Sequence, residues 1–166
     1  MYGKSKISLI VAANNRDVIG ADGGIPWGPI KEDMKRFREL TMGKPNVMGR
    51  KTWNSLPEKF RPLPGRINVV ISRQSNLSLK GAFVAPSLET ALDVLLVPEV
   101  CIIGGGDIYN AALPYADTVY LTRIVNDMNG DVFFKPLDRK IWKLETDTVV
   151  RGDGYHFATY HRVVAT

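Results

Sequence analysis

The chain has 166 residues, of which 45% are hydrophobic and 23% are charged, as in ordinary soluble globular proteins. This length predicts a single domain, residues 1–166, that can bury a stable core without cross-links. The net charge of +5 comes from basic residues scattered through turns. That pattern gives little support for nucleic-acid binding and is equally explained by an anionic small-molecule partner. No apolar run is long enough to span a membrane.

Cysteine and histidine are too few for a disulfide or a zinc site. Cys101 is the only cysteine and lies in an apolar strand pattern, which favours a buried, unreactive thiol. His156 and His161 are the only histidines, so no metal is expected. The apolar run at residues 7–13 is too short for a signal sequence, and we expect a cytoplasmic protein.

Strand patterns alternate with helix patterns along the chain. Strands are predicted at residues 7–13, 46–48, 67–72, 82–85, 100–103 and 118–124, and loops at 14–24 and 57–65. Helices are predicted at residues 30–42, 51–56, 88–96 (with Ser87 as N-cap) and 108–113. Residues 143–150 and 155–164 predict an antiparallel pair around a turn at 151–154. We therefore expect an α/β fold with a mostly parallel twisted sheet of about eight strands, the last antiparallel, flanked by about four helices.

Three consecutive glycines, Gly104, Gly105 and Gly106, stand between a predicted strand and a predicted helix. Glycine costs conformational entropy, so three in a row indicate that Cβ atoms are not tolerated there. A ligand phosphate lying against the backbone at the helix start would explain them. The alternative is a tight strand-to-helix connection without a ligand.

Asp33 shares one face of the predicted helix with Phe37 and Thr41. An acid on an apolar stripe is costly to bury unless a cationic or amidine-like ligand satisfies it. Burial would also raise its pKa toward the range that proton chemistry requires. The alternative is that Asp33, like Glu32, only favours the first turn of an exposed helix.

Basic residues follow two predicted strands. Arg50-Lys51-Thr52 follows one strand and Arg73 the other, and neighbouring strand ends would combine them into an anion pocket. Arg66 could hold a carboxylate with a bidentate fork. The alternatives are solvated turns and a surface arginine.

In this order, the motifs resemble dihydrofolate reductase over residues 7–163. The motifs are Val18-Ile19-Gly20, Ile25-Pro26-Trp27, Asp33 with Phe37 and Thr41, Met48-Gly49-Arg50-Lys51-Thr52-Trp53, Arg61-Pro62-Leu63-Pro64-Gly65-Arg66, Val70-Ile71-Ser72-Arg73, Ile103-Gly104-Gly105-Gly106 with Tyr109, Tyr120-Leu121-Thr122, and Gly130-Asp131. The resemblance implies reduction of 7,8-dihydrofolate to tetrahydrofolate by NADPH, which feeds one-carbon and thymidylate metabolism. Hydride passes to C6 of the pterin and N5 gains a proton. It also implies antifolate inhibitors as ligands, and we expect a monomer.

The resemblance also implies roles for individual residues. Asp33 matches the acid that holds the pterin 2-amino group and N3 and favours protonation of N5, with water as the immediate donor. Thr122 matches the hydroxyl that supports this acid, and Trp27 the indole that positions the water. The other substrate-binding positions are Ile10, Met34, Phe37, Phe60, Leu63, Ile103 and Tyr109, with Arg66 on the α-carboxylate of the glutamate tail.

The cofactor positions follow from the same resemblance. They are Ala12, Ile19, Gly20, Gly49, Arg50, Lys51, Thr52, Ser72, Arg73, Gly104, Gly105, Gly106, Asp107, Ile108 and Tyr109. Residues 14–25 match a mobile loop that closes over nicotinamide and excludes water. In the family the bond between Gly104 and Gly105 is cis. Arg50, Lys51 and Arg73 suit the extra phosphate of NADPH over NADH.

Some positions depart from the common pattern of the family. Many bacterial relatives have the acid one residue closer to Trp27, where this chain carries Glu32. We choose Asp33 because its spacing to Phe37 and Thr41 matches the family helix. Asp107 stands where several relatives carry a basic residue, and residues 57–61 resemble the vertebrate arrangement.

Two other functions remain open. A related pterin or pyrimidine reductase on this fold would share the glycines and NADPH but would not need Asp33 paired with Thr122, or Arg66. A binding module for an anionic nucleotide or a nucleic acid would need no chemistry at all. Oxidation of NADPH that depends on dihydrofolate separates both from a dihydrofolate reductase.

Overall fold

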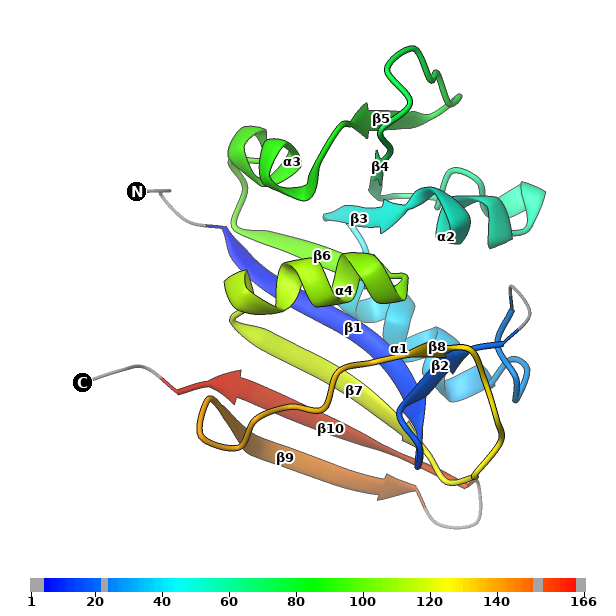
Figure 1. The fold of residues 1–166 in the computed structure, drawn as a ribbon, viewed down its shortest axis with the longest axis vertical. Coiled ribbons are helices and arrows are strands. Elements are labelled where there is room, and N and C mark those ends of the chain that lie inside the picture. Colours follow the sequence, from blue (N-terminus) through cyan, green and yellow to red (C-terminus); the bar gives the residue numbers. More distant parts are fainter. Residues whose placement is uncertain (1–4, 22–23, 151–153, 164–166) are drawn as a thin grey trace.

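The computed structural model describes residues 5–21, 24–150 and 154–163. Its framework is a sheet of eight strands in the order β5-β4-β3-β6-β1-β7-β10-β9 (Figure 1). The strands are β1 (Lys6–Asn14), β3 (Pro45–Gly49), β4 (Ile67–Ile71), β5 (Ala82–Ala85), β6 (Glu99–Gly104), β7 (Thr118–Ile124), β9 (Trp142–Val150) and β10 (Tyr155–Arg162). Pairs among β1 and β3–β7 are parallel, whereas β10 is antiparallel to β7 and β9. The expected sheet is confirmed.

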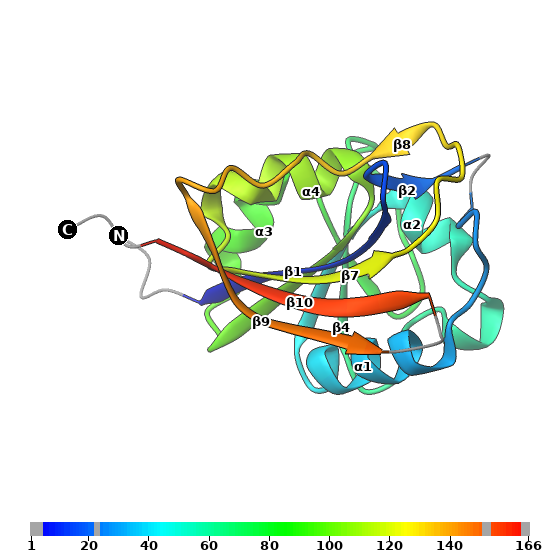
Figure 2. The same ribbon diagram turned by 90° about the horizontal axis from the view of Figure 1, so that it is seen from below.

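The four helices lie within two residues of their predicted bounds. They are α1 (Lys31–Thr41), α2 (Arg50–Ser55), α3 (Leu88–Val94) and α4 (Gly106–Ala112). Short 3₁₀ turns add Glu58–Phe60 and Leu113–Tyr115. Ser87 caps α3 as predicted, because its side chain accepts a hydrogen bond from the Thr90 N–H at 3.1 Å. Helices α3 and α4 cover one face of the sheet and α1 the other (Figure 2).

The alternating side chains of β1 supply both hydrophobic cores. Leu9 and Val11 point into the cluster that includes residues of α3 and α4, and burying each contributes about 1.5–3 kcal/mol. Ile10 packs into the second cluster, which contains Met48 and Trp53 and touches α1 through Phe37. A central strand that is apolar on both faces fits the predicted buried run.

The segment predicted as a loop at residues 14–24 contains a strand, so that prediction was wrong in part. β2 (Val18–Gly20) pairs antiparallel with β8 (Val132–Phe133), which the sequence did not predict. These strands are too short to show a period. Each one forms only by pairing with the other, which lies more than a hundred residues away in sequence. Residues 22–23 of the loop, 151–153 of the predicted turn and 164 of the predicted last strand lie outside the described residues.

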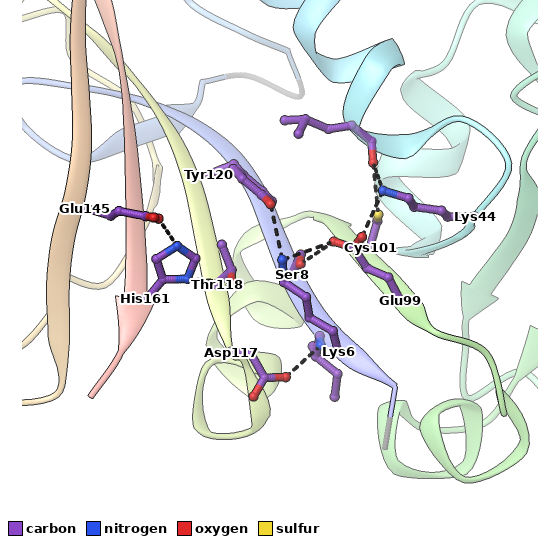
Figure 3. A network of polar contacts seen from close by, with 12 residues as sticks. Lys6, Ser8, Lys44, Glu99, Cys101, Asp117, Thr118, Tyr120, Glu145 and His161 are labelled. Atoms are coloured by element: carbon purple, nitrogen blue, oxygen red, sulfur yellow. Dashed lines mark hydrogen bonds and ion pairs between the residues drawn. The ribbon is translucent and has the colours of Figure 1, made fainter. Parts of the chain in front are cut away.

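A polar network fastens the C-terminal end of α1 to the sheet (Figure 3). Glu99 accepts a hydrogen bond from Ser8 Oγ at 2.7 Å and pairs with Lys44 Nζ at 2.9 Å. Lys44 Nζ also donates to the Leu40 carbonyl at 2.9 Å, where a cation suits the helix end. Burial alone would raise the pKa of Glu99, but the hydrogen bonds from Lys44 and Ser8 bring it below its ordinary value.

Cys101 lies beside this network and is fully buried, as the sequence predicted. Burial raises the pKa of its thiol to about 12, so the group stays protonated and unreactive at neutral pH.

The position of the cleft follows from the topology. Strands β1 and β6 are parallel neighbours, but α1 follows β1 on one face and α4 follows β6 on the other. Connections that leave adjacent strands on opposite faces open a crevice at the carboxyl ends of those strands.

Asn68 ties the loop that carries Leu63 and Arg66 to β4. Its side chain, 1% exposed, accepts from the Leu63 N–H and donates to the carbonyls of Leu63 and Arg66 at 2.8–3.1 Å. We predict that Asn68→Ala lowers the free energy of unfolding by about 1–3 kcal/mol per buried backbone group left unsatisfied. Urea denaturation measures the loss. Asn76→Ala, at an exposed site, is the control and should change stability by less than about 0.5 kcal/mol.

Candidate active site

A cleft of about 2290 Å³ runs along the carboxyl ends of β1, β3, β4 and β6. Of the site residues predicted from the sequence, those that line it are Ala12, Ile19, Gly20, Trp27, Asp33, Met34, Phe37, Gly49, Arg50, Lys51, Thr52, Phe60, Leu63, Arg66, Ser72, Arg73, Ile103, Gly104, Gly105, Gly106, Asp107, Ile108 and Tyr109. Glu32 is exposed and lies outside the lining, so the helix presents Asp33 to the cleft instead.

Ile10 and Thr122 are the two predicted site residues that do not line the cleft. Ile10 packs in the second hydrophobic cluster, and its carbonyl accepts a hydrogen bond from Tyr109 Oη at 2.6 Å. Thr122, on β7, is 3% exposed and acts through its neighbour, because its Oγ1 donates to Asp33 Oδ1 at 2.6 Å.

Asp33 stands in the first turn of α1, where its carboxyl group meets Thr122 of β7. Burial raises the pKa of Asp33 above its ordinary value, and the Thr122 hydrogen bond and the charge of Arg36 offset this only partly. A carboxyl group held in this way is suited to proton chemistry near neutral pH. It can also accept paired hydrogen bonds from an amidine-like ring.

Two arginines, Arg38 and Arg66, line the cleft. Arg66 Nη1 donates to Thr41 Oγ1 at 3.3 Å and Nε donates to the Pro64 carbonyl at 2.9 Å. Its guanidinium carbon is 6.0 Å from the centroid of the Phe37 ring. Burial lowers the pKa of Arg66, and the neighbouring charge of Arg38 lowers it further. Two close positive charges next to an apolar wall favour binding of a carboxylate.

The three consecutive glycines, Gly104, Gly105 and Gly106, differ in what a Cβ atom would meet at each position. Gly104 has φ 122°, and a Cβ there would meet the Tyr109 ring at 3.2 Å. A Cβ on Gly106 would approach Val132 Cγ1 to 2.7 Å. A Cβ on Gly105 would meet only Thr52 Oγ1, at an ordinary 3.5 Å. Packing within the protein therefore explains Gly104 and Gly106, whereas no close neighbour in the described part of the chain accounts for Gly105.

The basic residues at the other strand ends come together as the sequence suggested. Gly49, at the end of β3, stands opposite Ile71, at the end of β4, so Arg50 and Arg73 follow adjacent strand ends. Both line the cleft together with Lys51, Thr52 and Ser72. Asp107 is exposed at the start of α4 in the same cleft. The peptide bond between Gly104 and Gly105 is cis, as expected.

Several lining residues were not predicted. Val132 and Phe133 reach the cleft because β8 pairs with β2, and no local pattern marks that contact. Arg38 could have been found, since its spacing of four residues from Met34 places both on one face of the helix. The lining also includes Ser55 and Gln74, whose polar side chains have no distinguishing spacing.

Comparison with known proteins gives the family. Residues 6–164 match the family model described as dihydrofolate reductase. The chain belongs to the dihydrofolate reductase family. A dihydrofolate reductase from Neisseria meningitidis is 44% identical over 162 residues, covering 95% of this chain and 98% of the relative. Another, from Mycobacterium tuberculosis, is 45% identical over 162 residues, covering 94% and 98%.

A solved structure agrees with the dihydrofolate reductase fold. It is the dihydrofolate reductase from Enterococcus faecalis, complexed with NADP(H) and RAB-propyl. The two structures superpose with a TM-score of 0.83 at 30% sequence identity, and the match covers 98% of this chain and 99% of that chain.

We predict that Asp33→Asn stabilises the protein at neutral pH. The ordinary carboxyl pKa of 3.8 applies to the unfolded chain, and burial raises the folded value. The native state therefore binds the proton more tightly, and the parent loses stability as the pH rises above 3.8 through the folded pKa. Asparagine has no charge to desolvate, and its Oδ1 can accept the same bond from Thr122.

Thermal unfolding at several pH values checks this prediction. The stability difference between the Asn variant and the parent should grow as the pH rises from about 4 to about 7. Glu32→Gln removes an exposed carboxylate one residue away and should show no comparable gain. An Asn variant that is less stable than the parent at neutral pH would contradict the prediction.

Proposed function

We propose that this protein reduces 7,8-dihydrofolate to tetrahydrofolate with NADPH, by hydride transfer to C6 and protonation of N5. The observation that carries the proposal is Asp33: a largely buried carboxyl group in the wall of a large cleft, held by a threonine on β7. Family membership over residues 6–164 and the NADP(H) complex of the Enterococcus faecalis relative support the substrate and the cofactor.

Asp33 is the residue that binds the reacting ring and controls its proton. Its free carboxylate oxygen accepts from the pterin 2-amino group and N3, since Thr122 already occupies the other oxygen. The fixed negative charge favours a proton on N5, which the adjacent water delivers. Trp27 lines the same cleft and positions that water. Phe37, Ile103 and Tyr109 close the walls around the ring.

The remainder of the substrate lies along the slot between α1 and residues 60–66. Met34, Phe60 and Leu63 line this slot, and Arg66 takes the α-carboxylate of the glutamate tail. Ile10 is also proposed for this pocket, where it contributes through the packing of the second cluster and the carbonyl that holds Tyr109.

The cleft residues fit NADPH, because the bare backbone at Gly105 is a cradle that a Cβ would fill. When bound, the cofactor supplies the hydride. Gly104, Gly106, Asp107 and Ile108 would flank it there, and Ala12, Ile19, Gly20 and Tyr109 would hold the nicotinamide side. Gly49, Arg50, Lys51 and Thr52 would bind phosphates, and Ser72 and Arg73 the 2′-phosphate. Asp107 opposes this charge and weakens affinity.

The wider properties follow from the same proposal. We propose one domain over residues 1–166 that works as a cytoplasmic monomer, binds antifolate inhibitors in the substrate slot and needs no nucleic-acid partner. The buried, reduced Cys101 suits a reducing compartment. In the described part of the chain, no helix is long and apolar enough to cross a membrane.

The direct test is oxidation of NADPH that depends on dihydrofolate, followed by absorbance. We predict that Asp33→Asn folds but loses about a hundredfold to ten-thousandfold in rate at neutral pH, the usual contribution of positioned proton chemistry. The deficit should shrink at acid pH, because solvent then supplies the proton. A pH–rate profile unchanged by the substitution would remove Asp33 from the mechanism. Turnover of another pterin or a pyrimidine, but not of dihydrofolate, would favour the related reductase.

Arg66→Ala is predicted to weaken dihydrofolate binding with little effect on NADPH. A lost charge-assisted hydrogen bond costs about 1.5–3 kcal/mol, or roughly tenfold to a hundredfold in affinity. The loss should disappear with a dihydropterin that lacks the glutamate tail. Arg61→Ala, in the same loop but outside the cleft lining, is the matched control and should bind dihydrofolate normally.

Gly105→Ala and Gly106→Ala should separate ligand contact from internal packing. We predict that Gly105→Ala keeps its melting temperature but binds NADPH at least about tenfold more weakly, since the new methyl group occupies the cradle. Gly106→Ala should instead lower the melting temperature, because its Cβ meets Val132. Fluorescence titration and thermal unfolding measure the two effects. Equal NADPH affinity in Gly105→Ala and the parent would be evidence against the cradle.

A further inference from the structure

Arg36 is a partly buried charged residue of α1 that has no role in the proposed reaction so far. It lies one helical turn after Asp33, outside the cleft lining, and is partly buried against the sheet. Its guanidinium carbon is 4.5 Å from the centroid of the Phe157 ring and 5.6 Å from that of Tyr120. Its Nη2 also donates to Thr159 Oγ1 at 3.4 Å. Arginine side chains on helices are usually solvated, whereas these contacts with the sheet fix the position of the Arg36 charge.

The strand register explains why the contacts converge on one face. Phe157 and Thr159 alternate with His156 and Ala158 on β10, and they stand opposite Thr122 and Tyr120 of β7. The face that receives Arg36 therefore also carries Thr122, the partner of Asp33. Stacking on an aromatic ring keeps the guanidinium at a fixed place relative to that carboxyl group.

Among the side chains that the structure describes, the other titratable groups around Asp33 come from β7, α4 and α1 itself. Tyr120 of β7 accepts from Lys6 Nζ at 3.3 Å (Figure 3). Tyr109 of α4 is bonded to the Ile10 carbonyl, and burial and the charge of Asp33 raise its pKa. On α1 itself, Glu32 and Lys35 are exposed to solvent.

Further along β10, His161 bonds to Thr118 and Glu145 (Figure 3). Burial raises the pKa of Asp33, and the Thr122 hydrogen bond and the charge of Arg36 lower it. Burial of the Arg36 side chain lowers the pKa of Arg36 itself.

We propose that Arg36 is a positioning residue for the reduction: stacked on Phe157, it holds a positive charge beside Asp33 and thereby sets the pH above which hydride transfer slows. The inference rests on the proposed function for its kinetic readout. An ionised Asp33 favours a proton on N5, and a nearby cation weakens that effect. Removing the cation should therefore let N5 keep its proton to higher pH. Because Arg36 is partly buried, bulk salt screens this interaction less than it screens a surface pair.

The test compares Arg36→Met, which keeps the unbranched stem without the charge, with Arg36→Lys, which keeps the charge. Two readouts are measured: the pH profile of the hydride-transfer rate in a single turnover, and the carbon-13 NMR titration of the Asp33 carboxyl group in the protein without ligands. We expect Arg36→Met to move both midpoints to higher pH and Arg36→Lys to restore them toward the parent. Phe157→Leu keeps the charge but removes its stacking partner, and should move them part of the way.

Lys31→Gln is the control, since it removes an exposed charge from the same helix outside the cleft lining. It should move neither midpoint in about 0.1 M salt. Arg36→Met that melts earlier but leaves both midpoints in place would show a purely structural arginine and overturn the proposal. If Arg36→Met does not fold, Phe157→Leu is used instead: a shift of both midpoints supports the proposal, and unchanged midpoints overturn it. A shifted NMR midpoint in a protein without dihydrofolate turnover would support the coupling and refute the proposed function.

Discussion

The hydrogen bond from Thr122 Oγ1 to Asp33 Oδ1, 2.6 Å long, is the contact on which the site depends. It joins the first turn of α1 to the centre of β7 and holds a carboxyl group where water is scarce. The sheet provides the threonine, and the helix provides the acid. Burial raises the pKa of Asp33, and the arrangement that is predicted to lower stability at neutral pH suits the proposed proton chemistry. In this proposal, stability and activity at Asp33 oppose each other.

The two ends of α1 use charge in opposite ways. At its C-terminal end, Lys44 and Glu99 form a bonded network that satisfies the helix carbonyl of Leu40, and every charge there has a near partner. At its N-terminal end, Asp33 is left with one hydroxyl donor and one cation held at a distance by Phe157. The first arrangement fastens the helix to the sheet. The second leaves Asp33 Oδ2 without a hydrogen bond from the residues that the structure describes, and we propose that a ligand binds there.

The glycines of residues 104–106 also divide into those that internal packing requires and one that is proposed to contact a ligand. Gly104 and Gly106 are needed because Tyr109 and Val132 pack against them. Gly105 has no such neighbour, so its bare backbone is available to a cofactor. Strand β8 pairs with β2 and thereby places Val132 against Gly106, the first residue of α4. The glycine run is therefore both a packing junction and the proposed floor of the cofactor site.

The sequence alone determined the strands and helices of the main sheet, because their periodicity is local. It also placed Asp33 on a face with Phe37, and Gly104–Gly106 between a strand and a helix, for the same reason. The motifs shared with the family implied that Thr122 supports Asp33, but it is the tertiary structure that brings these residues, 89 positions apart, into contact. Only tertiary structure likewise formed β2 with β8, set Ile10 behind the cleft wall and stacked Arg36 on Phe157. Each of these depends on residues distant in sequence that meet only when the sheet assembles, and no local pattern records such a meeting.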